Sequence, residues 1–133
     1  MKTSIITVIL LLISVFSNAQ EIQERKTVNT GASIEWKSST TYDFGSIKKG
    51  IQVTSTFEFT NNGNEPLIIS DAKGSCGCTS VEYPQQPIAP GEVGIVKATY
   101  NALAVGAFYK TVSVSTNISN KVILLNIKGQ VTE

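Results

Sequence analysis

Residues 52–60 show the clearest pattern in the chain, in which hydrophobic residues fall at every second position except Ser55. Val53, Ser55, Phe57 and Phe59 fall on one face, and the intervening threonines and Glu58 fall on the other. A period of two is typical of a β-strand with one buried and one solvated face. The pattern therefore predicts a strand that covers a hydrophobic core.

Similar short runs recur along the chain, and none carries the i, i+3, i+4 spacing of an amphipathic helix. Trp36, Tyr42 and Phe44 are the expected inward-facing anchors of the first strands, and Gly129 is expected where packing tightens in the last one. Strands are expected at residues 34–37, 41–44, 52–60, 66–70, 96–100, 108–115 and 121–131. About seven strands with polar turns predict an all-β fold, an immunoglobulin-like β-sandwich, with a closed barrel as the alternative.

Turn motifs separate these runs. Asn62 and Gly63 lie in an Asn-Asn-Gly-Asn segment, and because Asn and Gly tolerate positive φ, we expect a tight hairpin between residues 52–60 and 66–70. Pro90 and Gly91 fit the two central positions of a type II turn, in which proline fixes φ and glycine takes the positive φ. A further turn is expected at residues 119–120, before the last strand.

The first 19 residues have the pattern of a cleavable signal peptide. Lys2 supplies a positive charge, residues 5–16 are apolar except for Thr7 and Ser14, and small residues precede the expected cleavage after Ala19. As a helix the apolar run spans roughly 18 Å, well short of the ~30 Å hydrocarbon core of a bilayer. We therefore expect an exported protein, periplasmic or secreted, that keeps no membrane anchor after cleavage.

The expected mature chain divides into two parts. Residues 20–33 are polar without an apolar period and predict a flexible leader, and residues 34–133 predict the sandwich domain. This is enough chain for one core that needs neither a metal nor several disulfides.

Composition excludes several classes of function. The chain has 11 Lys plus Arg and 10 Asp plus Glu, and loss of Lys2 with the signal leaves 10 of each sign, so no strong field attracts nucleic acid. Histidine is absent, which removes Ser-His-Asp and Cys-His catalysis and histidine zinc sites. No catalytic residues and no cofactor are therefore predicted, and we expect a protein without enzymatic activity.

Both cysteines of the chain, Cys76 and Cys78, are separated only by Gly77. In an exported protein they should be bonded to each other, bonded to another chain, metal-bound or buried. A bond between them is feasible, because Cα atoms two residues apart in a strand lie roughly 6–7 Å apart and glycine lets the backbone curl. The closed loop is so short that its entropic stabilisation is only on the order of 1–2 kcal/mol.

Three interpretations of this pair remain open. Cys76 and Cys78 are either chemically silent residues at a sheet edge, a reducible pair that exchanges disulfides with a partner, or a Cu(I) site. The metal interpretation is weak, because the expected mature chain offers neither histidine nor methionine as a further ligand. A structural zinc site needs four ligands, and only two good ones exist.

Five motifs occur in the order found in the bacterial domain-of-unknown-function family 1573: YDFGSI at 42–47, FEFTN at 57–61, EPLII at 65–69, SCGCT at 75–79 and APGE at 89–92. The chain resembles this family from Tyr42 to Val131, and the family's thiol and turn motifs fall on Cys76, Cys78, Pro90 and Gly91. The resemblance implies an immunoglobulin-like sandwich related to major-sperm-protein, Hydin-like and chaperone-like domains. It also implies an exported protein of a kind common in Bacteroidota, and no established activity.

Two hypotheses for the function follow. The first is an exported, non-enzymatic interaction or structural domain that binds a protein of the cell envelope through sheet edges or end loops. The alternative is a thiol-redox or Cu(I)-handling module centred on Cys76-Gly77-Cys78. The residues do not specify an oligomeric state.

Overall fold

The computed structural model describes residues 30–118 and 121–133, and this part of the chain contains eight strands and no helix. The strands are β1 (Ile34–Trp36), β2 (Thr41–Lys48), β3 (Val53–Asn61), β4 (Ile69–Gly74), β5 (Thr79–Glu82), β6 (Val93–Tyr100), β7 (Gly106–Thr116) and β8 (Val122–Thr132). The described residues contain no helix long and apolar enough to span a bilayer. The expected signal peptide, residues 20–29 of the leader and the turn at residues 119–120 lie outside the described residues.

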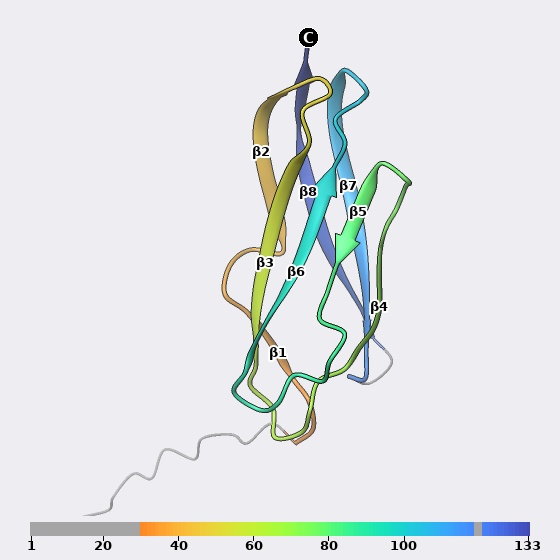
Figure 1. Ribbon diagram of the computed structural model, residues 1–133. Coiled ribbons are helices and arrows are strands. Elements are labelled where there is room, and N and C mark those ends of the chain that lie inside the picture. The colour runs from red at the N-terminus through yellow and green to blue at the C-terminus, as the bar shows by residue number, and fades with distance from the viewer. Residues whose placement is uncertain (1–29, 119–120) are drawn as a thin grey trace, which may run out of the picture.

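The strands form two four-stranded sheets packed face to face (Figure 1). The first sheet has the order β1-β3-β6-β5 and the second the order β2-β8-β7-β4. All neighbours are antiparallel except β2 and β8, which run parallel. Since both sheets keep unpaired edges, the closed barrel is wrong, and the predicted immunoglobulin-like sandwich is confirmed.

The core lies between the two sheets and follows the predicted alternation. Phe57 and Phe59 of β3 are buried, as the period of two in residues 52–60 requires. The other large fully buried apolar side chains come from both sheets and one connection: Leu67, Val96, Val112, Val114, Leu125, Ile127 and Val131. Burying each such side chain contributes roughly 1.5–3 kcal/mol, so this layer is the main source of the fold's stability.

Each sheet contains a glycine that lies opposite a phenylalanine on the neighbouring strand. Gly94 pairs with Phe59 between β6 and β3, and Gly129 pairs with Phe108 between β8 and β7. A Cβ added at Gly94 would lie 2.3 Å from the Phe59 ring, and one at Gly129 would lie 2.8 Å from the Phe108 ring. The two glycines leave room for the rings, which explains why packing tightens at Gly129 as predicted.

The expected hairpin between residues 52–60 and 66–70 is wrong. β3 belongs to the first sheet and β4, which begins only at Ile69, belongs to the second, so the chain crosses the sandwich between them. Leu67 makes an isolated bridge to Ile88 instead of extending the strand. The Asn62-Gly63 segment also contains no residue with positive φ, so the bend is not of the predicted turn type.

Asn61 holds this crossing together. Its side chain is fully buried, and its Nδ2 donates to the carbonyl oxygens of Glu65 at 2.8 Å and Ile88 at 2.9 Å. Its Oδ1 accepts from the backbone N–H groups of Ser33 at 3.3 Å and Gly63 at 3.1 Å. One amide therefore joins the start of the domain, the crossing and the segment before β6.

The last residues of the expected leader pack against the same bend. Gly31 and Asn64 exchange hydrogen bonds, with the Gly31 N–H donating to Asn64 Oδ1 at 2.6 Å and the Asn64 N–H to the Gly31 oxygen at 3.0 Å. A Cβ at Gly63 would lie 2.0 Å from the Gly31 oxygen. Gly63 is thus required by close backbone approach, and Gly31, although expected in the flexible leader, is bonded to the folded domain.

Tyr42 is not an inward anchor, in contrast to the expectation. Its side chain is 45% exposed, whereas Trp36 and Phe44 are partly buried against the core. Tyr42 lies on the edge strand β2, and its ring makes an edge-on contact with Phe44 at a centroid distance of 4.8 Å. The position of β2 at the edge of its sheet leaves part of the Tyr42 ring in contact with solvent.

The turn at Pro90 and Gly91 has the features expected from the sequence. Gly91 has a φ of +82°, and the Glu92 N–H donates to the Ala89 oxygen at 3.0 Å. Positive φ at the third residue and the bond from the fourth to the first define a type II turn. It leads the chain into β6.

Candidate functional site

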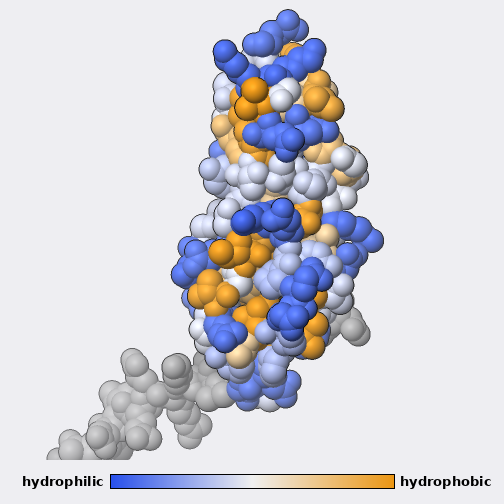
Figure 2. Space-filling model, in the orientation of Figure 1, coloured by the Kyte–Doolittle hydropathy of each residue, from blue (hydrophilic) through white to orange (hydrophobic). Residues whose placement is uncertain are grey.

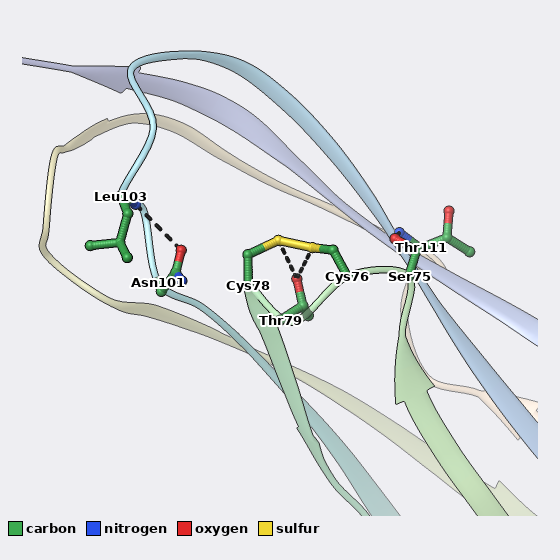
Figure 3. The surroundings of a disulfide bond; sticks show 7 residues. All are labelled: Ser75, Cys76, Cys78, Thr79, Asn101, Leu103 and Thr111. Atoms are coloured by element: carbon green, nitrogen blue, oxygen red, sulfur yellow. Dashed lines mark hydrogen bonds between the residues drawn. A yellow bond between two sulfur atoms is a disulfide. The ribbon is translucent and has the colours of Figure 1, made fainter.

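Cys76 and Cys78 lie in the connection between β4 and β5, at the upper end of the molecule in Figure 1. β4 is an edge strand of the second sheet and β5 an edge strand of the first, so residues 75–78 join the two sheets at their rim. The two sulfur atoms are bonded to each other, and the Cα atoms lie 5.3 Å apart (Figure 3). Both side chains are half-buried.

Backbone hydrogen bonds hold this disulfide loop, residues 75–78, on both sides. The Ser75 N–H donates to the Thr111 oxygen on β7 at 2.8 Å, and the Thr111 N–H donates back to Ser75 Oγ at 3.3 Å. On the other side, the Asn101 N–H donates to the Cys78 oxygen at 3.0 Å. The loop is therefore fixed to both sheets independently of the sulfur atoms.

Two residues next to the cysteines shape the loop. A Cβ at Gly74 would lie 2.6 Å from the Thr79 oxygen, so only glycine allows the two ends to approach this closely. The buried Thr79 places its Oγ1 4.0 Å from Cys76 Sγ and 3.9 Å from Cys78 Sγ, between the two sulfur atoms (Figure 3). In the disulfide the sulfurs carry no proton, so the hydroxyl is the donor.

Removing the disulfide should change stability only slightly. For the double variant Cys76→Ser/Cys78→Ser we expect a loss of about 1–2 kcal/mol in the free energy of unfolding, because the bond closes a very short loop. Urea denaturation of both proteins, with and without reductant, measures this loss. A double variant that fails to fold would show that the bond is a structural staple.

The disulfide between Cys76 and Cys78 argues against a Cu(I) site in this oxidised form of the chain. Cu(I) binds thiolates, and both sulfurs are here engaged in the disulfide, so reduction must precede any metal binding. Among the described residues, no group of three or more histidine, cysteine, aspartate or glutamate side chains comes together to hold a metal.

Exposed apolar side chains surround the same end of the sandwich. Ile51, Leu103 and Val105, which we call the apolar rim, are 60%, 65% and 48% exposed. They lie in the β2–β3 and β6–β7 connections, which are tied together by a hydrogen bond from the Gly50 N–H to the Ala102 oxygen at 2.9 Å. Figure 2 shows apolar surface at this end, next to hydrophilic residues.

The apolar rim is continuous with the disulfide loop through Asn101. The N–H of Asn101 binds Cys78, while its Oδ1 accepts from the Leu103 N–H at 3.3 Å (Figure 3). Exposed Lys48 and Lys49 border the rim, and neither is in an ion pair within the part of the chain that the structure describes. Glu133 follows Thr132, which pairs with Lys48, so the end combines a disulfide, apolar side chains and two lysines beside one carboxylate side chain.

Sequence reasoning found the cysteines but missed the apolar rim and Thr79. The run Asn-Ala-Leu-Ala-Val at residues 101–105 contains four consecutive apolar residues after a strand, which is a usable signal. Nothing in the sequence indicated that Ile51 would lie beside this run. No sequence pattern indicated Thr79 either. Its hydroxyl lies near the sulfur atoms only because β5 begins directly after the disulfide loop.

The sheet edges are poorly suited to pairing with another strand. β1 has three residues and β5 has four. β2 has a register shift between Asp43 and Ser46, and β4 has one between Ile69 and Asp71. Short or bulged edges are the usual means by which proteins prevent strand addition.

Solved structures share the fold at low sequence identity. The seventh PapD-like domain of human CEP192, an ASH domain, is 14% identical with a TM-score of 0.60, over 91% of this chain and 97% of that domain. A Porphyromonas gingivalis protein of unknown function is 17% identical with a TM-score of 0.65, over 78% of this chain and 49% of that one. The Vibrio cholerae protease VesB is 16% identical with a TM-score of 0.56, over 77% of this chain and 32% of the protease.

These likenesses show a PapD-like, immunoglobulin-like fold and nothing further. The chain spans about half of the P. gingivalis protein and about a third of the protease. No curated protein matches it in sequence. A family model does match, over residues 34–131, and it carries the description "protein of unknown function". The match covers most of the chain and confirms the resemblance seen in the motifs: this chain belongs to the DUF1573 family.

Proposed function

We propose that this chain is an exported, non-enzymatic domain that binds a protein partner through the apolar rim. The main support is that Ile51, Leu103 and Val105 expose apolar side chains on two adjoining loops, at the end of the sandwich that carries the disulfide. Other large apolar side chains, such as Val122 and Leu124, are exposed elsewhere, and the rim differs from them in joining two loops at the end that carries the disulfide. Contiguous exposed apolar surface marks interaction sites. Export is supported by the signal-like pattern of residues 1–19.

The charge of this end defines the chemistry of the partner. Lys48 and Lys49 border the rim, and neither forms an ion pair with another described residue. A segment with apolar side chains flanked by aspartate or glutamate matches both features, because charges placed around an apolar contact speed association and exclude wrong partners. The partner proposed is therefore a protein with such an acidic-apolar segment in the cell envelope.

The loops are a better binding surface than the sheet edges. Each edge strand is either short or bulged, which disfavours pairing with a peptide strand. A non-enzymatic role is supported by the absence of histidine from the sequence.

Charge placed on the rim should abolish binding. For Leu103→Asp/Val105→Asp we expect at least a tenfold loss of partner capture, because two carboxylates would be buried in an apolar contact beside an acidic partner. Capture is measured with the purified chain against the envelope fraction of the producing cells, and the bound proteins are identified by mass spectrometry. Lys48→Glu/Lys49→Glu should lower the amount of partner captured. It should also make capture less sensitive to added salt, because the attraction between opposite charges is lost.

Val122→Asp/Leu124→Asp is the matched control. These two side chains are 55% and 53% exposed and lie at the start of β8, near the opposite end of the sandwich. This variant should capture the same protein as the unmodified chain. Equal capture by both double-aspartate variants would refute the rim as the binding surface.

A further inference from the structure

We infer that the Cys76–Cys78 disulfide is the reactive group of this end, and that it oxidises a pair of thiols on the protein that binds the apolar rim. The inference rests on the proposed function and adds a chemistry to it. Its basis is the position of the disulfide, which lies beside the rim, half-exposed, in a loop that holds its shape without it. Disulfides that solvent can reach are reduced and exchanged more readily than buried ones.

A partner can reach the disulfide. Gly77, between the two cysteines, is exposed, and a Cβ added there would meet no atom within 4 Å. The space above the loop is therefore open. Asn101 accepts a hydrogen bond from the Leu103 N–H and donates one to the Cys78 oxygen, so the rim and the disulfide loop are neighbours. A protein bound to the rim would therefore present its own thiols next to the sulfur atoms.

The loop should keep its shape in both redox states. Its anchors are the bonds of Ser75 to Thr111 and of Cys78 to Asn101, and these involve no sulfur atom. Reduction would thus leave two thiols side by side instead of opening the connection. A pair that stays together after reduction can be oxidised again, as a repeated exchange requires.

The two sulfur atoms are not equivalent. Cys78 packs against the hydrophobic core, whereas Cys76 does not, so Cys76 Sγ is the atom that an incoming thiolate meets. Cys78 then leaves as a thiolate. The Thr79 hydroxyl, 3.9 Å from Cys78 Sγ, is placed to donate a hydrogen bond to that thiolate. A stabilised thiolate leaves faster.

The exchange balances without any further reagent. A partner thiolate attacks Cys76 Sγ, forms a mixed disulfide and releases the Cys78 thiolate. The second partner thiolate then attacks the partner's own sulfur in the mixed disulfide and releases the Cys76 thiolate. The partner loses two electrons and forms a disulfide, and the two protons of its thiols pass to Cys76 and Cys78.

The chemistry is tested with dithiothreitol and the folded full-length chain. The fraction of reduced cysteines is followed by alkylation and mass spectrometry while circular dichroism reports folding. We expect complete reduction with an unchanged folded spectrum. Thr79→Val should slow reduction about 3- to 10-fold, which corresponds to the loss of one hydrogen bond to the leaving sulfur, and Thr79→Ser should restore the rate.

Two results would overturn the inference. One is a disulfide that stays oxidised until the chain unfolds. The other is a Thr79→Val rate equal to that of the unmodified chain, since the hydroxyl would then play no part.

Single cysteine variants test the partner. In producing cells that also keep the unmodified chain, which oxidises the partner, the Cys76 thiolate of Cys78→Ser should attack the partner's disulfide, release one partner thiolate and remain joined in a reductant-sensitive adduct. Cys76→Ser should form far less of this adduct because Cys78 packs on the core. If neither variant forms an adduct while rim-dependent capture persists, the exchange is refuted and the proposed function stands. If adducts form equally well with Leu103→Asp/Val105→Asp, the rim is refuted and the exchange stands.

Discussion

Replacing Asn61 by alanine is expected to cost about 3 kcal/mol in the free energy of unfolding. The variant removes an amide that makes four hydrogen bonds and is fully buried. Backbone groups of Ser33, Gly63 and Glu65 would each lose this partner, and water cannot readily replace it in the interior. Equilibrium urea denaturation of both proteins measures the loss.

The neighbouring Asn62 provides a matched control. Its side chain is exposed, and its one side-chain hydrogen bond, to Glu35 Oε2 at 3.1 Å, is on the surface. Asn62→Ala should therefore change stability by no more than about 0.5 kcal/mol. Equal losses for the two variants would contradict the role given to Asn61.

The second large effect is expected at Phe59. Its ring is fully buried, contacts Trp36 edge-on at a centroid distance of 5.2 Å and lies over Gly94. Phe59→Ala should cost about 3–5 kcal/mol, because the ring leaves a cavity that the two sheets can fill only in part. Thermal and urea unfolding both report this loss.

A double-variant cycle with Gly94→Ala tests the contact itself. In the unmodified chain the added methyl group would clash with the Phe59 ring and cost about 1–3 kcal/mol. After Phe59→Ala the same methyl group has room and should cost much less. Additive losses would contradict the pairing of ring and glycine.

Much of the fold was predictable because it depends on short-range patterns. The alternation in residues 52–60 identified β3 and its buried face, and Pro90-Gly91 identified a type II turn whose geometry is local. The pairing of β3 and β4 was not predictable in the same way. Both a hairpin and a crossing fit an Asn-Gly segment, and the choice depends on long-range bonds of Asn61 to residues 33 and 88.

The candidate site was predictable only in its chemistry. Two cysteines separated by glycine in an export-type sequence pointed to a disulfide, but not to its surroundings. The site draws on the β2–β3 connection for Ile51, on the β6–β7 connection for Leu103 and on strand β5 for Thr79. Only the packing of the sheets brings these residues to one end. Tyr42 shows the same limit, because its exposure follows from the position of β2 at the edge of its sheet, which a local pattern does not reveal.

Site-specific photo-crosslinking in the producing cells tests most directly whether the disulfide-bearing end is the contact surface. A photoreactive amino acid is placed, one position at a time, at Ile51, Leu103 and Val105, and at Val122 and Leu124 for comparison. We expect the first three positions to crosslink to one and the same protein and the last two to give no such adduct. Adducts of equal yield from both sets, or from Val122 and Leu124 alone, would contradict the assignment of this end as the binding surface.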